Sequence, residues 1–140
     1  MEKDFKIRWN WLKVVYILTI IVAGGLGLAT ILAPAATTSF LGITCARATY
    51  GIVGSVYLAF GILSILGLRE PLKFVPVLLL QLTYKTAWLL GVALPLLVQG
   101  RLPDSEISTI IIFVIIVALD LIAIPFKWVF SKKPERDLLG

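Results

Sequence analysis

The sequence contains no histidine and only one cysteine, Cys45. A single cysteine cannot form a disulfide within the chain or a CxxC redox pair. Histidine and cysteine are also the side chains that hold zinc, haem iron and iron–sulfur clusters in proteins. Sites of those kinds are therefore excluded, and with them many of the reactions of membrane oxidoreductases. The sequence predicts no cofactor and no metal.

Charged residues are also scarce. They make up 15% of the 140 residues, whereas hydrophobic residues make up 59%, and the mean hydropathy is +1.00. A soluble domain is about a quarter charged and about half apolar. The length allows one domain, residues 1–140, whose excess apolar surface has to face lipid. The net charge of +5 does not indicate nucleic acid, because the basic residues cluster at the ends of apolar segments.

Four long apolar runs cover most of the chain, at about residues 14–33, 48–68, 74–98 and 107–128. About 20 apolar residues span a bilayer, and a backbone in hydrocarbon must satisfy its own hydrogen bonds. The sequence therefore predicts an all-α membrane protein, a bundle of four transmembrane helices. Pro95 and Pro125 predict kinks in the last two helices, and Asp104 or Ser105 is suited to cap the fourth. The first run is too long for a signal peptide, so we expect a retained helix.

Lysine and arginine are distributed unevenly between the two sides that four spans define. One side would carry ten of them, namely Lys3, Lys6, Arg8, Lys13, Arg69, Lys73, Lys127, Lys132, Lys133 and Arg136. The other side would carry only Arg47 and Arg101. Cytoplasmic loops are enriched in basic residues. We therefore expect both termini in the cytoplasm, with residues 1–13 as an interfacial segment and residues 131–140 as a tail.

Two opposite charges lie inside the apolar runs. Lys85 is about eleven residues, or ~16 Å, from the cytoplasmic end of the third span, and Asp120 is about nine residues, or ~14 Å, from that of the fourth. Matching depth on consecutive helices predicts that the two groups meet inside the bundle. A lone charge there costs at least about 2.5–3.5 kcal/mol. Either the pair is a binding or proton-handling centre, or it only fixes helix packing.

Polar and aromatic side chains surround this predicted pair. Gln81, Tyr84 and Trp88 share the helical face of Lys85, and Tyr57 lies at a similar depth on the second span. Together they would line a polar, aromatic pocket, with Arg47 and Tyr50 at its outer mouth. The alternative for each aromatic residue is simple packing, and for Tyr50 a place in the interfacial belt.

Small residues predict where helices approach each other. The first span contains Ala23, Gly24, Gly25 and Gly27, and the second has Gly51, Ser55 and Ala59 at four-residue spacing. Such faces let helix backbones come close. We assign them first to packing inside the bundle and second to contact between copies.

The segment 47–97 resembles the small four-helix bacterial membrane proteins called DoxX-like. The likeness lies in the Arg47-x-x-Tyr50-Gly51 entry to the second span, its glycine-rich continuation and a polar third helix. The resemblance implies a four-helix bundle in a bacterial plasma membrane. DoxX is associated with a quinone-linked oxidoreductase, but no redox motif accompanies the likeness here, so that activity is not carried over.

Three functions stay open at this stage. The first is a non-enzymatic protein that binds or transports a small lipophilic or amphipathic molecule at Lys85 and Asp120. The second is an accessory subunit of a membrane complex, in which the pair is structural and the partner is another membrane protein or a second copy. The third is a membrane isomerase that uses Asp120 or Lys85 as acid or base.

Overall fold

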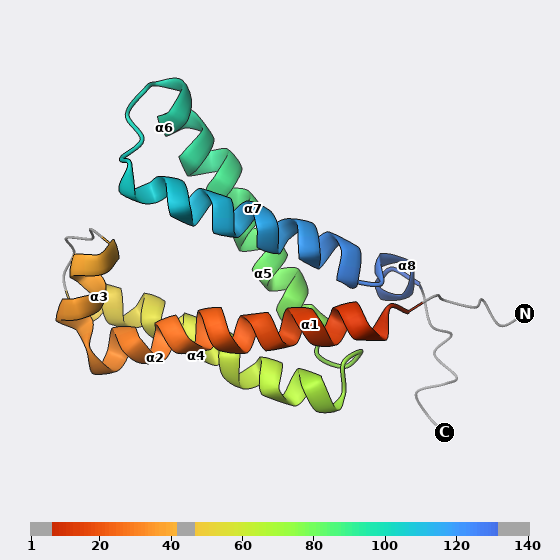
Figure 1. The fold of residues 1–140 in the computed structure, drawn as a ribbon. Coiled ribbons are helices and arrows are strands. Elements are labelled where there is room, and N and C mark those ends of the chain that lie inside the picture. Colours follow the sequence, from red (N-terminus) through yellow and green to blue (C-terminus); the bar gives the residue numbers. More distant parts are fainter. Residues whose placement is uncertain (1–6, 42–46, 132–140) are drawn as a thin grey trace, which may run out of the picture.

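The computed structural model describes residues 7–41 and 47–131, and every regular element in those ranges is a helix (Figure 1). Four helical stretches are long and apolar enough to cross a membrane: Trp9–Leu32, Ala48–Arg69, Val75–Val98 and Ser105–Ala123. The predicted class, an all-α membrane protein with four spanning helices, is confirmed at this level. The segments 1–6 and 132–140, predicted to be interfacial and tail regions, lie outside the described residues.

Ten helical elements make up the described residues. In order they are α1 (Trp9–Thr19), the π-helix η1 (Ile20–Gly24), α2 (Gly25–Leu32), α3 (Pro34–Leu41), α4 (Arg47–Arg69), α5 (Val75–Trp88), the π-helix η2 (Leu89–Ala93), α6 (Leu94–Val98), α7 (Ser105–Ala123) and α8 (Phe126–Val129). The first span is therefore α1, η1 and α2 in succession, and the third is α5, η2 and α6.

Prolines mark most of the breaks between these helices. Ala33 leaves the helical region at φ −133° and ψ 61°, and Pro34 then opens α3. Proline suits a first helical turn because no backbone donor is lost there. Pro95 lies in the first turn of α6, and the π-helical turn η2 directly precedes it. The span thus continues as helix through Pro95, and the local π turn accommodates the hydrogen bond that proline cannot make.

The fourth span is shorter at its end than the sequence predicts. It ends at Ala123, because Ile124 turns to an extended conformation with ψ 123° in front of Pro125. The residue before a proline avoids the helical region for steric reasons. Asp120 is therefore three residues from the end of α7 rather than nine. Asp104 occupies the cap position at the other end, but its side chain makes no capping hydrogen bond.

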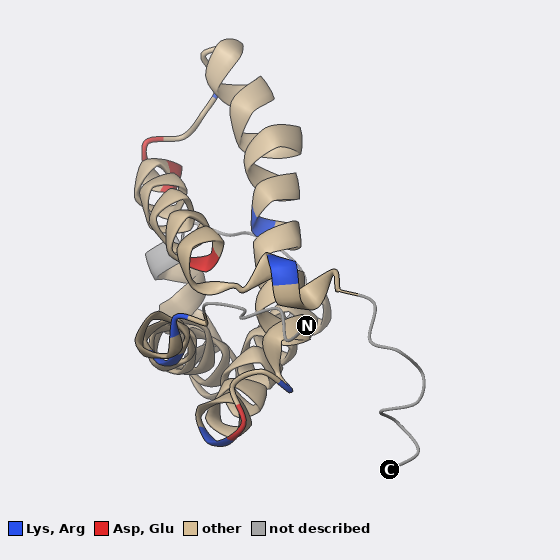
Figure 2. Ribbon diagram, turned by 90° about the vertical axis from the view of Figure 1, so that its right-hand side faces the viewer, with Lys and Arg blue, Asp and Glu red and all other residues tan. Residues whose placement is uncertain are grey.

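The four spans form two helical hairpins. The first span lies beside α4, and the third lies beside α7, as Figure 1 shows. Seen from the side in Figure 2, the second hairpin rises away from the first, and long stretches of every helix carry no charge. The loop between α6 and α7 is farthest from the first hairpin (Figure 1).

Glycines set the close approach of the first span to α4. A Cβ added to Gly61 would lie 2.5 Å from the Cα of Gly24, and one added to Gly27 would lie 2.3 Å from the backbone nitrogen of Leu58. The expected role of Gly24 and Gly27 in packing is thus confirmed. The face of α4 that they meet carries Gly54 and Gly61, whereas Gly51, Ser55 and Ala59 do not form this contact. Our assignment of Gly51, Ser55 and Ala59 to internal packing is wrong.

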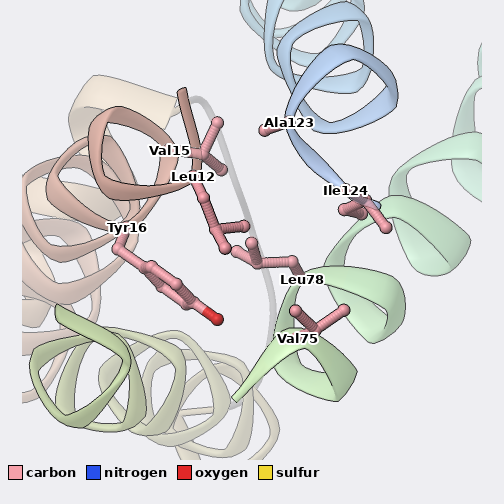
Figure 3. Close-up of a cluster of buried hydrophobic side chains, with 7 residues drawn as sticks. All are labelled: Leu12, Val15, Tyr16, Val75, Leu78, Ala123 and Ile124. Carbon is pink, nitrogen blue, oxygen red and sulfur yellow. The ribbon is translucent and has the colours of Figure 1, made fainter. Parts of the chain in front are cut away.

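A cluster of seven buried side chains joins the two hairpins at one end; we call it the apolar base. It consists of Leu12, Val15, Tyr16, Val75, Leu78, Ala123 and Ile124 (Figure 3). The hydroxyl of Tyr16 donates a hydrogen bond to the carbonyl of Pro71 at 2.8 Å, which ties α1 to the loop before α5. The base therefore brings together the start of α1, the start of α5 and the end of α7. The candidate site residues lie next to it along the helices.

Candidate intramembrane polar site

Lys85 and Asp120 are both buried, with 2% and 0% of their surfaces exposed. The ammonium of Lys85 donates a hydrogen bond to Oε1 of Gln81, one turn earlier on α5. The Lys85 side chain points back along α5 toward Gln81, because long side chains lean toward the N-terminal end of their helix. The Lys85 side chain thus extends toward the apolar base, and toward the level at which α7 ends.

The hydrogen bonds of this lysine continue into the first hairpin. Nε2 of Gln81 donates to Oγ1 of Thr19 at 2.9 Å, and Thr19 donates in turn to the carbonyl of Val15 at 2.9 Å. Gln81 and Thr19 are both buried. We call the chain Lys85–Gln81–Thr19 the polar relay. It links α5 to α1 in the interior, and sequence reasoning missed Thr19 because a single threonine in an apolar run carries no distinctive signal.

Asp120 does not join this relay. Neither of its carboxyl oxygens has a hydrogen-bond partner, and the ion pair found among the described residues is Lys73 with Glu70 on the surface at 2.6 Å. The expected direct pair of Lys85 with Asp120 is therefore not formed. Gln81 has taken the place that the carboxylate was expected to hold.

Tyr84 lies at the centre of an aromatic cluster next to the relay. Its ring stacks on Phe60 of α4 with centroids 5.5 Å apart, and it meets Tyr57 and Phe113 edge to face at 6.2 and 6.1 Å. Trp88 extends the cluster by meeting Phe113 at 5.2 Å. Such geometries are the favoured ones for aromatic pairs. The structure thus brings Tyr57, Tyr84 and Trp88 into one aromatic cluster.

The cluster also surrounds the lysine. The ammonium nitrogen of Lys85 is 5.1 Å from the ring centroid of Tyr84 and 5.8 Å from that of Phe113. Both distances are within the range of cation–π attraction. Phe113 went unnoticed in the sequence, although it lies seven residues before Asp120 and hence on the same face of α7.

Two further polar atoms in this region lack partners. The hydroxyl of Tyr84 and the hydroxyl of Ser64 are buried without a hydrogen bond, as are the two oxygens of Asp120. A buried polar group with no partner costs about 1–3 kcal/mol, and more when it carries a charge. Because most buried polar groups in proteins are paired, each exception needs an explanation, such as a bound ligand or water.

The two residues predicted for the mouth of the pocket are placed differently. Tyr50 lines a groove between α2 and α4 whose lining contains none of the other predicted ligand residues. Arg47 begins α4, and its side chain lies outside the described residues. The polar site therefore consists of Lys85, Gln81, Thr19 and Asp120 with the aromatic cluster, and Tyr50 belongs to another part of the surface.

This arrangement offers hydrogen-bond acceptors in an apolar and aromatic setting. The carboxyl of Asp120 can accept hydrogen bonds, and the hydroxyls of Ser64 and Tyr84 can donate or accept. In the described part of the chain, no three acidic, histidine or cysteine side chains come together to hold a metal ion.

No family model, no curated protein and no solved structure matches this chain.

Proposed function

We propose that this protein binds or transports a small lipophilic or amphipathic molecule at the buried site between the hairpins. The observation that carries the proposal is the carboxyl of Asp120, which is 0% exposed while both of its oxygens lack partners. Its potential partner Lys85 is already bonded to Gln81 and faces two aromatic rings. Asp120 thus offers two free acceptor oxygens at this site, next to the unpaired hydroxyls of Ser64 and Tyr84.

The surroundings of Asp120 suggest the chemistry of the ligand. Two acceptor oxygens favour a molecule that donates hydrogen bonds, such as a hydroxyl or an amine. The rings of Tyr84 and Phe113 favour an apolar or aromatic body. The ligand class is therefore a lipophilic alcohol, phenol or amine dissolved in the membrane, and Tyr57, Gln81 and Trp88 complete the wall on the side of Lys85.

In this proposal the protein lies in a bacterial plasma membrane with both termini in the cytoplasm. The basic residues of the α4–α5 loop and of the helix ends near the apolar base support that orientation. The DoxX-like resemblance supports the choice of membrane. The hairpins diverge on the side away from the base (Figure 1).

Two related probes test the role of Asp120. We would measure the melting temperature of the detergent-purified protein with 2-naphthol, which donates a hydrogen bond, and with 2-methoxynaphthalene, which cannot. A ligand that binds the folded state raises the melting temperature. We expect 2-naphthol to stabilise the wild type more than the ether does, and Asp120→Asn to reduce that difference. Asp104→Asn makes the same change at an exposed residue and should leave the difference intact. Equal shifts with both probes in the wild type would contradict a donor-binding site.

A second function is favoured by a different observation. The polar relay ties α5 to α1, and this is what a purely structural network would do in an accessory subunit of a membrane complex. In that case Lys85→Met with Asp120→Leu would keep full activity of the complex, and one partner would co-purify reproducibly. Under the binding proposal the same double variant folds but no longer discriminates between the two naphthalene probes.

A further inference from the structure

A groove of about 580 Å³ runs along the first hairpin between α2 and α4. Thr30 and Ile31 of α2 form one wall, and α4 forms the other from Ala48 to Ala59. The α4 wall includes the small residues Ala48, Gly51, Ser55 and Ala59. A Cβ added to Gly51 would meet nothing within 4 Å. The volume is within the range of about 300–1,000 Å³ that is typical of small-molecule sites.

The hydrogen-bonding groups of this groove are satisfied with one exception. The hydroxyl of Ser55 donates to the carbonyl of Gly51 at 2.9 Å, and that of Thr30 donates to the carbonyl of Leu26 at 2.7 Å. Tyr50 is only 4% exposed, and its hydroxyl has no partner. The rest of the lining that the structure describes is apolar and contains no charged side chain. The groove therefore suits an apolar ligand with a single hydrogen-bond acceptor.

The position of Tyr50 along α4 determines how deep in the membrane the ligand's hydrogen-bond acceptor must lie. Tyr50 is three residues after the start of α4, about 4.5 Å along the helix axis, and Ala59 is nine residues further, about 14 Å deeper. The ends of spanning helices lie near the boundary between headgroups and acyl chains. The acceptor thus lies at that boundary, and the apolar part of the ligand extends toward the middle of the membrane.

An acyl chain of a membrane lipid has this shape and this chemistry, with an ester carbonyl at the boundary and a hydrocarbon chain below it. We infer that the groove between α2 and α4 binds one acyl chain of a glycerolipid, whose ester carbonyl accepts a hydrogen bond from Tyr50. A second copy of the chain fits less well. The carbonyls along a spanning helix already accept one hydrogen bond within the helix, so they are weaker acceptors for Tyr50 than the free carbonyl of an ester.

The test compares two lipids that differ only in the carbonyl. The full-length protein is placed in nanodiscs with equal amounts of a diester phosphatidylcholine and its diether analogue, and the retained lipids are counted by native mass spectrometry. We expect the wild type to retain the diester about two- to tenfold more than the diether, the range of one net hydrogen bond. Tyr50→Phe removes only the hydroxyl and should abolish this preference while lipid retention persists.

A matched pair of glycine variants tests the groove itself. Gly51→Leu adds a side chain inside the groove at a position where its Cβ meets nothing within 4 Å, and it should lower the retention of both lipids. Gly25→Leu makes the same change at another glycine with open space around it, outside the groove lining, and should not. No ester preference in the wild type, or a preference that survives Tyr50→Phe, would overturn the inference. A dimer that Gly51→Leu dissociates, with no lipid preference, would instead assign this face to contact between copies.

Discussion

Gln81 donates a hydrogen bond to Thr19 across 62 positions of the chain, and this bond joins the interior of the two hairpins. Gln81 also accepts the hydrogen bond of Lys85, so its side-chain amide is satisfied on both sides. An amide is suited to this place because it can donate and accept at once. The buried lysine is thereby held by a neutral group from its own helix, and the carboxylate of Asp120 stays without a hydrogen bond.

The first prediction concerns this relay. Thr19→Val removes the acceptor of the Gln81 amide and should lower the free energy of unfolding by about 1–3 kcal/mol, because a buried donor is left unpaired. Thr83→Val is the control, since Thr83 is exposed and bonds only to the carbonyl of Leu79 on its own helix. Reversible unfolding in mixed micelles measures both. Equal effects of the two variants would show that the relay adds nothing to stability.

The second prediction concerns the glycine contact of the first hairpin. Gly27→Ala would place a Cβ 2.3 Å from the backbone nitrogen of Leu58, so the two helices must separate. We expect a loss of several kcal/mol, about the upper end of what single substitutions cause. Gly25→Ala has open space and should be neutral or stabilising by up to about 1 kcal/mol, since alanine is the better helix former. Similar losses for both would contradict the contact.

The third prediction tests how Lys85 and Asp120 are coupled. A double-mutant cycle of Lys85→Met and Asp120→Leu should give an interaction energy of about 0.5–3 kcal/mol, the usual range for residues in one network. The double variant should be folded, because it leaves no unpaired charge in the interior. Unfolding free energies of the four proteins supply the cycle. If the changes in unfolding free energy of the two single variants are additive, the two side chains do not interact.

The fourth prediction concerns orientation in the membrane. In a chain whose single cysteine is replaced (Cys45→Ser), a new cysteine at Lys73 should react with a membrane-impermeant thiol reagent only from the cytoplasmic side. A cysteine at Arg101 should react only from the outside, because one span separates the two exposed loops. Labelling of intact cells against inverted vesicles measures this. Reaction of both sites from the same side would contradict the arrangement of spans.

Much of this architecture could be predicted from the sequence because lipid imposes simple rules. Length and hydropathy were enough to find four spans, and the burial of Lys85 and Asp120 followed from the cost of exposing a charge to acyl chains. The end of the fourth span was misjudged because Pro125 was expected to bend the helix, whereas Ile124 already leaves it.

The details of the site depended on facts that one chain's sequence does not carry. Phe60 and Phe113 lie in apolar runs, and the sequence of such a run does not distinguish a ring that faces lipid from one that faces the interior. Gly54 and Gly51 are both glycines of α4, and only the rotation of the helix decides which of them meets the first span. The choice of Gln81 over Asp120 as the partner of Lys85 depends on side-chain directions within the bundle.

The apolar base has a mechanical consequence for the molecule. Because the base, the Gln81–Thr19 hydrogen bond and the Tyr84–Phe60 stack hold the hairpins together only along part of the spans, a relative tilt of the hairpins grows with distance beyond these contacts. The third span covers 24 residues, or about 36 Å. A small tilt that hardly moves Leu78 therefore displaces the far end of α6 by a much larger distance.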